Sequence, residues 1–260
     1  MWSAKSSPKY EPAPNTVAGD FLTHLEELRG RLIFSLAVFF IATLLSFFFS
    51  RTLLDFFIRP LTRFENITLY FQSPQEAFLT HLAASALAGF VLSTPFLLTQ
   101  LWFFITPGLY ASEKKIILSL ALVSFFLFLI GALFAYLVVV PWGLRFLLSF
   151  QTENLKPLLG AGPYFSFLIG MIVAFGVLFD FPVVIFGLVR LGIVEPRTLS
   201  RSRRAVAVAA FVISAILTPS TDPISQTLLA IPLIVLFEMS VAISRLGERM
   251  RVPSVDTQRI

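Results

Sequence analysis

The sequence predicts an all-α polytopic membrane protein in which six transmembrane helices form a single bundle. Two observations support this fold class. Apolar residues make up 57% of the 260 residues and charged residues only 13%, about half the share found in soluble domains. The apolar residues also gather in blocks close to the roughly 20 residues that a helix needs to cross a bilayer, with polar turns between the blocks. Lipid is therefore the solvent that suits this composition.

Six apolar blocks are long enough, or nearly long enough, to span the membrane. They are Leu32–Phe49, residues 78–105, Ile116–Val140, Tyr164–Leu188, Ala205–Leu217 and Ile224–Ile243. Proline is expected to end the third block at Pro141, to lie inside the fourth at Pro182 and to interrupt the sixth at Pro232. The fifth block would reach only about 20 Å, against a hydrocarbon core of about 30 Å. We therefore expect the bilayer to be thinner around it.

The distribution of Lys and Arg predicts how the bundle is oriented. About three-quarters of the 20 Lys and Arg residues fall in the N-terminal segment, the loops after the second and fourth blocks, and the C-terminal segment. Cytoplasmic loops have the excess of positive charge in membrane proteins, so both termini are expected in the cytoplasm. Residues 1–20 are then a flexible N-terminal tail, residues 21–245 a single membrane domain, and residues 246–260 a C-terminal cytoplasmic tail.

Several classes of function lack the residues that they need. The chain has no cysteine and only two histidines, and it contains no His-Glu-x-x-His, no Gly-x-Ser-x-Gly and no P-loop. We therefore expect no enzyme activity, no metal and no cofactor. The basic residues are scattered between apolar blocks rather than collected in a stripe, so nucleic acid is not an expected partner.

Two carboxylates fall inside apolar blocks. Asp180 lies in the middle of the fourth block and Glu238 in the sixth. A charged Asp at a helix centre costs roughly 2.5–3.5 kcal/mol on insertion scales, so such residues normally face protein or water and often have a function. The structural alternative for Asp180 is a hydrogen bond to a backbone group freed by Pro182. For Glu238 the structural and functional interpretations stay open.

An amphipathic segment leads into the first block. Phe21, Leu25, Leu28 and Leu32 recur at helical spacing and form an apolar stripe, and Thr23 with Glu26 fits a capping box. His24, Glu27 and Arg31 share another face. From the residues alone, Glu27 and Arg31 are best explained as an exposed i,i+4 ion pair.

Other polar residues stand where helices should begin. Glu113 follows Ser112 at the start of the third helix, where a cap and a favourable helix dipole explain both residues. Cap and turn chemistry also explains most of two clusters on the opposite side. These clusters comprise Ser73, Pro74, Glu76 and Phe78 before the second helix, and Asp222 and Gln226 between the fifth and sixth helices.

Five motifs together resemble the TatC family, the receptor subunit of the twin-arginine, or Sec-independent, protein translocase. They span about residues 20–245 in the right order. The motifs are Phe21-Leu-Thr-His-Leu-Glu-Glu-Leu-Arg-Gly-Arg-Leu32, Ser73-Pro-Gln-Glu-Ala-Phe78, Phe104-Ile-Thr-Pro-Gly-Leu-Tyr110, Phe175-Gly-Val-Leu-Phe-Asp-Phe-Pro182 and the stretch from Leu217 to Pro232. Each motif is modest by itself, and their common register makes the resemblance specific.

The resemblance implies that the six helices form a cup-like bundle, and that the protein is a receptor for folded precursors that have an Arg-Arg signal peptide. It further implies assembly with TatA-like and TatB-like single-span subunits, self-association in a larger complex, and export driven by the proton-motive force. The expected location is the inner (plasma) membrane, or a thylakoid or other organellar membrane in a eukaryote. The alternative from another class is a small-solute or ion secondary transporter with Asp180 as its site, but the two repeated halves expected of it are not visible.

The resemblance also implies roles for particular residues. Glu27 and Glu113 match the cytoplasmic carboxylates with which the family binds signal peptides, and His24 and Arg29 accompany Glu27 in its motif. Asp180 matches an intramembrane acidic site where the family commonly has Glu or Gln, and we assign partner docking to Asp180 and Glu238. The outer clusters with Ser73, Pro74, Glu76, Phe78, Asp222 and Gln226 are assigned structural or functional roles on the periplasmic side.

Two Arg–carboxylate pairs are too weak to explain signal recognition alone. Hydrogen bonds to charged groups contribute about 1.5–3 kcal/mol each, so two pairs give about 3–6 kcal/mol. A micromolar complex needs about 8 kcal/mol. We therefore expect the apolar part of the signal peptide to supply the remainder.

Overall fold

A computed structural model describes residues 17–64, 67–105, 114–152, 158–190, 196–217 and 223–249. This part of the chain is almost entirely helical. Its elements are α1 (Val17–Phe47), α2 (Ser50–Ile58), the 3-10 turn η1 (Leu61–Arg63), β1 (Leu69–Tyr70), α3 (Pro74–Ile105), α4 (Lys114–Phe134), the π-helical turn η3 (Ala135–Val139), α5 (Val140–Leu148), β2 (Leu159–Gly160), α6 (Ala161–Phe179), α7 (Phe181–Arg190), α8 (Pro196–Arg201), α9 (Arg203–Leu217) and α10 (Pro223–Arg249).

These elements form the predicted six membrane-crossing units. Four segments are long and apolar enough to span a bilayer on their own: Leu25–Phe47, Pro74–Phe104, Leu118–Leu148 and Ala161–Val189. The third of them comprises α4, η3 and α5, and the fourth comprises α6 and α7. The remaining two units, α9 and α10, form a hairpin in which α9 has 15 residues and the apolar part of α10 is Leu229–Ala242.

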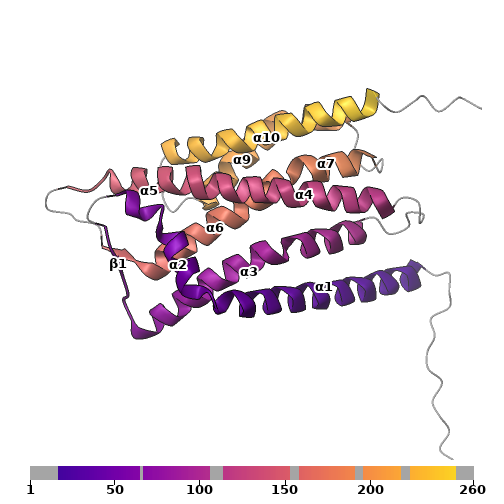
Figure 1. The fold of residues 1–260 in the computed structure, drawn as a ribbon. Coiled ribbons are helices and arrows are strands. Elements are labelled where there is room, and N and C mark those ends of the chain that lie inside the picture. Colours follow the sequence, from indigo (N-terminus) through magenta and orange to yellow (C-terminus); the bar gives the residue numbers. More distant parts are fainter. Residues whose placement is uncertain are drawn as a thin grey trace, which may run out of the picture.

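The units pack as neighbours from one edge of the bundle to the other. α1 packs on α3, which contacts α4 and α6; α4 packs on α6, and α10 packs on α7 and α9 (Figure 1). The main core lies between α3, α4 and α6, where Phe128, Phe165 and Phe175 are each 1% exposed. Many apolar side chains on the outer surface are exposed, such as Phe40 and Leu44 of the first unit. An outer surface of this kind suits lipid.

The two ends of the bundle differ in character. α1 begins and α10 ends at the same end of the bundle (Figure 1). We call it the basic end, because Arg29, Arg31, Arg203 and Arg204 lie there. The opposite end, which we call the strand end, contains β1 and β2. These pair in parallel, with Leu69 opposite Leu159 and Tyr70 opposite Gly160.

Three expectations about proline need attention, and two of them are wrong. The third unit does not end at Pro141, because the chain continues through the π turn η3 into α5, with Pro141 in the first turn of α5. The sixth unit is not interrupted, because α10 continues through Pro232. The fourth unit does contain Pro182, and its helix is broken two residues earlier, at Asp180 between α6 and α7.

The amphipathic leader and the first span form one continuous helix. α1 starts at Val17, so Thr23 lies inside the helix and the capping box predicted with Glu26 is wrong. The helical spacing of Leu25, Leu28 and Leu32 was nevertheless informative, because all three lie in this helix. Their side chains are exposed, so that this stripe is not covered by the rest of the chain.

Candidate functional site

The side chain of Arg31 is the centre of a polar cluster at the basic end. Its Nε and Nη2 donate hydrogen bonds to Glu27 Oε1 at 3.1 and 2.5 Å. Its Nη1 donates to Gln100 Oε1 at 3.1 Å, and its guanidinium carbon lies 5.6 Å from the centre of the Phe103 ring. Gln100 and Phe103 belong to the last turns of α3. The cluster therefore connects the leader part of α1 to the end of α3.

The predicted Glu27–Arg31 pair is present, and Arg31 has further partners that the sequence did not indicate. The Glu27–Arg31 pair has the expected i,i+4 spacing, and its side chains are 39% and 24% exposed. Gln100 and Phe103 come from a segment 69 positions or more away in the chain. No periodicity could have connected them to Arg31. What the sequence did offer was a Gln within an otherwise apolar stretch of the second span.

The other predicted signal-binding residues are only partly described. Arg29 is exposed on α1. The side chain of His24 and the whole of Glu113 lie outside the described residues. Glu113 directly precedes Lys114, the first residue of α4, and thus belongs to the connection between α3 and α4 at the basic end.

Asp180 occupies the break in the fourth unit. Its backbone N–H donates to the carbonyl of Val177 at 3.1 Å, and its own carbonyl accepts from the N–H groups of Val183 and Val184 at 3.0 Å each. The side chain is buried, with the residue 5% exposed, and Oδ1 has no hydrogen-bond partner among the described residues. The Asp180 carbonyl, rather than its carboxylate, thus satisfies the backbone at the break.

Contacts from α7 and α9 reach the middle of α10. The ring of Phe181, the residue after Asp180, has its centre 6.5 Å from that of the Phe237 ring in α10. One residue farther along α10 is Glu238, which Arg203 binds through Nη2 at 2.8 Å from Oε2. Both side chains of this ion pair are about half exposed. The pair joins the start of α9 to α10. It is a connection that the sequence did not predict.

At the strand end, Glu76 joins the starts of two helices. Its Oε2 accepts from the backbone N–H of Gln72 at 2.5 Å, and its Oε1 accepts from the backbone N–H of Gly162 at 2.7 Å. Its own N–H donates to the Ser73 carbonyl at 3.1 Å. The prediction that Pro74 begins the helix and Glu76 lies in its first turn is confirmed. The contact with Gly162 in α6 was not predicted, because a backbone donor leaves no sequence signature.

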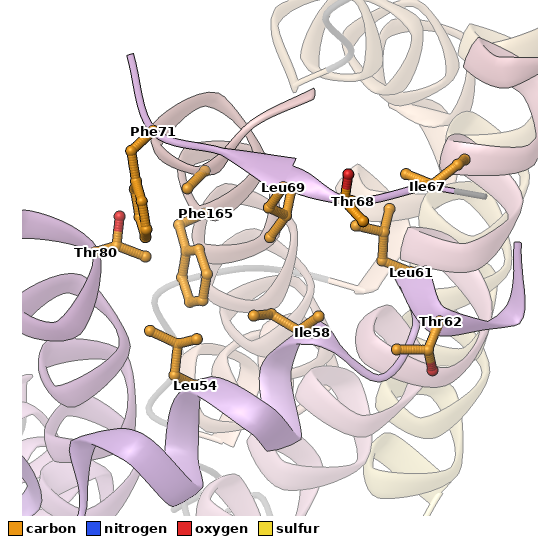
Figure 2. A pocket seen from close by; sticks show the side chains of 11 residues that line it. Leu54, Ile58, Leu61, Thr62, Ile67, Thr68, Leu69, Phe71, Thr80 and Phe165 are labelled. Carbon is orange, nitrogen blue, oxygen red and sulfur yellow. The ribbon is translucent and has the colours of Figure 1, made fainter. Parts of the chain in front are cut away.

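A cavity of about 320 Å³ lies beside this contact, between α2, β1 and the starts of α3 and α6 (Figure 2). Apolar side chains such as Leu54, Ile58 and Phe165 form most of its lining, and three threonines complete it: Thr62, Thr68 and Thr80.

The remaining predicted residues of this end have simpler surroundings. Phe78 is exposed, and its ring makes an edge contact with Phe47 at 6.2 Å. Gln226 is half-buried in the first turns of α10. Asp222 lies outside the described residues. Within the part of the chain that is described, no group of three or more His, Cys, Asp or Glu side chains could hold a metal ion.

Comparisons with known proteins agree with the fold and with the resemblance to the TatC family. The family model "Sec-independent protein translocase protein (TatC)" matches residues 23–232. The TatC protein of Aquifex aeolicus is 38% identical over 231 residues, which cover 88% of this chain and 95% of that protein. The TatC protein of Carboxydothermus hydrogenoformans is 35% identical over 222 residues, covering 85% and 91%.

Solved structures agree as well. A crystal structure of the twin arginine translocase receptor TatC superimposes with a TM-score of 0.77 at 38% identity, covering 87% of this chain and all of that one. A second TatC receptor structure, in the detergent DDM, gives the same TM-score and identity. The alternative of a secondary transporter is thereby set aside. The chain belongs to the TatC family of Sec-independent protein translocase proteins.

Proposed function

We propose that this chain binds the Arg-Arg signal peptides of folded precursors at the basic end, which faces the cytoplasm. As a TatC protein it is a multi-pass component of the Sec-independent translocase of the inner membrane. The observation that supports signal binding best is the Glu27 carboxylate, which is 39% exposed and already binds a guanidinium group, that of Arg31. Carboxylates suit the planar fork of arginine better than any other side chain does.

The orientation follows from charge. Arg29, Arg31, Arg203 and Arg204 lie at the basic end, and the connection through Lys114 and Lys115 adds two more cations. Positive residues favour the cytoplasmic side of a membrane. A signal peptide that arrives from the cytoplasm would therefore meet Glu27 and Glu113 at this end, accompanied by His24 and Arg29.

The apolar part of the signal peptide would bind beside Glu27. Leu25, Leu28 and Leu32 form an exposed stripe on α1, between 38% and 57% exposed. Burying apolar surface stabilises by about 25 cal/mol per Å², so about 100 Å² of such contact contributes about 2.5 kcal/mol. This lies within the deficit of about 2–5 kcal/mol that the two arginine–carboxylate pairs leave.

Docking of TatA-like or TatB-like partner helices would use Asp180 and Glu238. The buried Asp180 Oδ1 has no partner within the described chain, and an unsatisfied polar atom inside a membrane protein is costly. A polar side chain of a partner helix would satisfy it. Because Asp is shorter than the family's usual Glu or Gln, the partner must approach the break between α6 and α7 closely. The periplasmic-side residues, with Glu76 as the best connected, would hold the opposite end in shape.

Charge reversal tests the signal site. Glu27→Lys and Glu113→Lys should each abolish binding of an Arg-Arg signal peptide while membrane insertion stays normal, because a cation would replace the carboxylate. The measurement is pull-down of purified protein with the Arg-Arg peptide and with its Lys-Lys version. Asp55→Lys, an equal charge change on an exposed residue of α2, should leave binding unchanged. Normal export in either reversed variant would refute the site.

A second pair of variants tests the docking site. Asp180→Leu should retain signal binding but lose co-purification with the single-span subunits, because no acceptor is left for their polar group. Asp180→Asn keeps an acceptor oxygen and should retain part of the association. If Asp180→Leu assembled as well as the unmodified protein, docking at Asp180 would be disproved.

A further inference from the structure

Arg31 already occupies a complete binding site for a guanidinium group. The site consists of Glu27 Oε1, which accepts from two of its nitrogens, the amide oxygen of Gln100, and the ring of Phe103. A carboxylate, a neutral acceptor and an aromatic face are the three kinds of group that bind the planar fork of arginine. Only 24% of the Arg31 side chain is exposed, so the guanidinium is enclosed on several sides.

The occupant of this site belongs to the same chemical class as the ligand assigned to the receptor. A signal arginine that binds the Glu27 carboxylate with two parallel hydrogen bonds needs both of its oxygens. One of them is Oε1, to which Arg31 donates through both Nε and Nη2. Three hydrogen bonds to two oxygens and the ring contact must be weakened before a second guanidinium can take this position. An i,i+4 pair alone is weak, but the two contacts from α3 add to it.

We propose that Arg31 is an internal competitor that occupies the Glu27 site in the empty receptor and is displaced by an arginine of the signal peptide. This inference rests on the proposed function, because it assumes that Glu27 binds the signal. The exchange replaces one guanidinium by another, so Glu27 has a cationic partner before and after binding. Arg31 moves from the Gln100–Phe103 side into the solvent, where its exposed neighbours on α1 leave room.

Competition of this kind has a defined thermodynamic consequence. A receptor whose site is open for only a fraction of the time binds every ligand more weakly by that same fraction. Arg31 therefore raises the Kd of every cationic peptide by the same factor, and the order of their affinities does not change. The preference for Arg-Arg over Lys-Lys comes instead from the site itself, since an ammonium group cannot form a planar fork or stack on the ring as a guanidinium does.

A series of variants at Arg31 tests the proposal, with Kd for Arg-Arg and Lys-Lys signal peptides measured on the purified full chain in detergent. Arg31→Gln removes the competing cation and should tighten binding of both peptides by about five- to tenfold, the effect of an exposed ion pair plus a weak cation–π contact. Arg31→Lys is a poorer competitor and should give a smaller gain. The ratio of the two peptide affinities should not change.

The matched control is Arg204→Gln, which removes the same charge from an exposed position at the basic end. It measures how much the loss of one positive charge at this end tightens peptide binding in general. That change in Kd should be less than twofold at 0.15 M salt, because the Debye length is only about 8 Å. Thermal unfolding of each variant checks that it is folded. If Arg31→Gln does not fold, Arg31→Lys is sufficient for the test, because competition requires it to bind more tightly than the unmodified chain.

The possible failures are distinguishable. A role of Arg31 in positioning Glu27 predicts the opposite order, with Arg31→Gln weakest and partial recovery in Arg31→Lys. That order, or equal binding by all three proteins, would overturn the competitor while signal binding at Glu27 still stood. If Glu27→Gln left the Arg-Arg affinity unchanged, the proposed function itself would fail.

Discussion

Small residues determine how closely the central helices approach one another. A Cβ added at Gly131 in α4 would lie 2.4 Å from the carbonyl oxygen of Phe175 in α6, and one added at Gly176 would lie 2.4 Å from the ring of Phe128. Both distances are far inside van der Waals contact. Close backbone approach is the main way in which helices gain packing energy in lipid, where no hydrophobic effect drives them together.

We expect Gly131→Ala to lower the free energy of unfolding by about 1–3 kcal/mol, because the methyl group would collide with the backbone of Phe175 rather than with a movable side chain. Chemical unfolding in detergent, followed by fluorescence or circular dichroism, measures the change. Gly170→Ala is the control, since no atom lies within 4 Å of the added Cβ. It should be neutral or stabilising by up to about 1 kcal/mol. Equal effects of the two changes would contradict the packing argument.

At the scale of elements, a single carboxylate holds the starts of α3 and α6 together. The two oxygens of Glu76 accept from one backbone N–H near the start of each helix. A carboxylate is suited to this, because both of its oxygens are acceptors and negative charge is favourable at a helix start.

Glu76→Gln should destabilise the protein, because the amide offers only one acceptor oxygen and its NH₂ group would face a backbone N–H. Hydrogen exchange should accelerate specifically at the Gly162 and Gln72 amides. A general loss of stability would instead accelerate exchange at many amides. Asp55→Asn, with the same loss of charge on an exposed residue of α2, should leave both rates unchanged. Unaltered protection of Gly162 in Glu76→Gln would show that the carboxylate is dispensable.

The α9–α10 hairpin is too short for an ordinary bilayer. The 15 residues of α9 reach about 22 Å at 1.5 Å per residue, against about 30 Å of hydrocarbon. A half-exposed ion pair between Arg203 and Glu238 joins the first residue of α9 to α10, and we expect it to lie at the membrane interface. Charged groups of this kind remain at the interface rather than in the hydrocarbon.

Spin labels on the exposed positions Val208, Val212 and Ile216 should therefore all report shallow depths, because the bilayer thins to match the hairpin. Labels at the exposed Leu133 and Leu137 of the third unit provide the reference for normal depth. The measurement is collision of the labels with oxygen and with a polar relaxant in vesicles. A label on α9 at the depth of a normal bilayer centre would exclude thinning.

At the scale of the whole molecule, the six units pack on one another and leave no passage for a folded protein among the described residues. The middle is filled by Phe128, Phe165 and Phe175, each 1% exposed. We therefore expect transport of a folded precursor to depend on assembly with other subunits.

Vesicles containing only this chain should stay closed to a small trapped dye and to folded precursor, with or without a proton-motive force. Addition of TatA-like and TatB-like subunits and a proton-motive force should permit transport of an Arg-Arg precursor but not of its Lys-Lys version. Protease protection of the precursor inside the vesicles measures transport. Uptake by the chain alone would disprove the need for assembly.

The features that the sequence predicted are local ones. The six units follow from the length of apolar blocks, and Asp180 was found because a carboxylate in an apolar run is anomalous by itself. Pro141 and Pro232 were misjudged, because whether a helix tolerates proline depends on the turn before it and on its neighbours in space. Gln100 and Gly162 could not be assigned to Arg31 and Glu76, since partners far apart in the chain meet only after the helices pack.

The strand pair at the far end has a mechanical consequence. Leu69 and Tyr70 precede the second unit, and Leu159 and Gly160 precede the fourth. The two segments that lead into these units are therefore hydrogen-bonded to each other. The strand pair thus restrains how far the second and fourth units can move apart at the strand end. Any separation of these two units would then be largest at the basic end, beside Arg31, where we propose that the signal peptide binds.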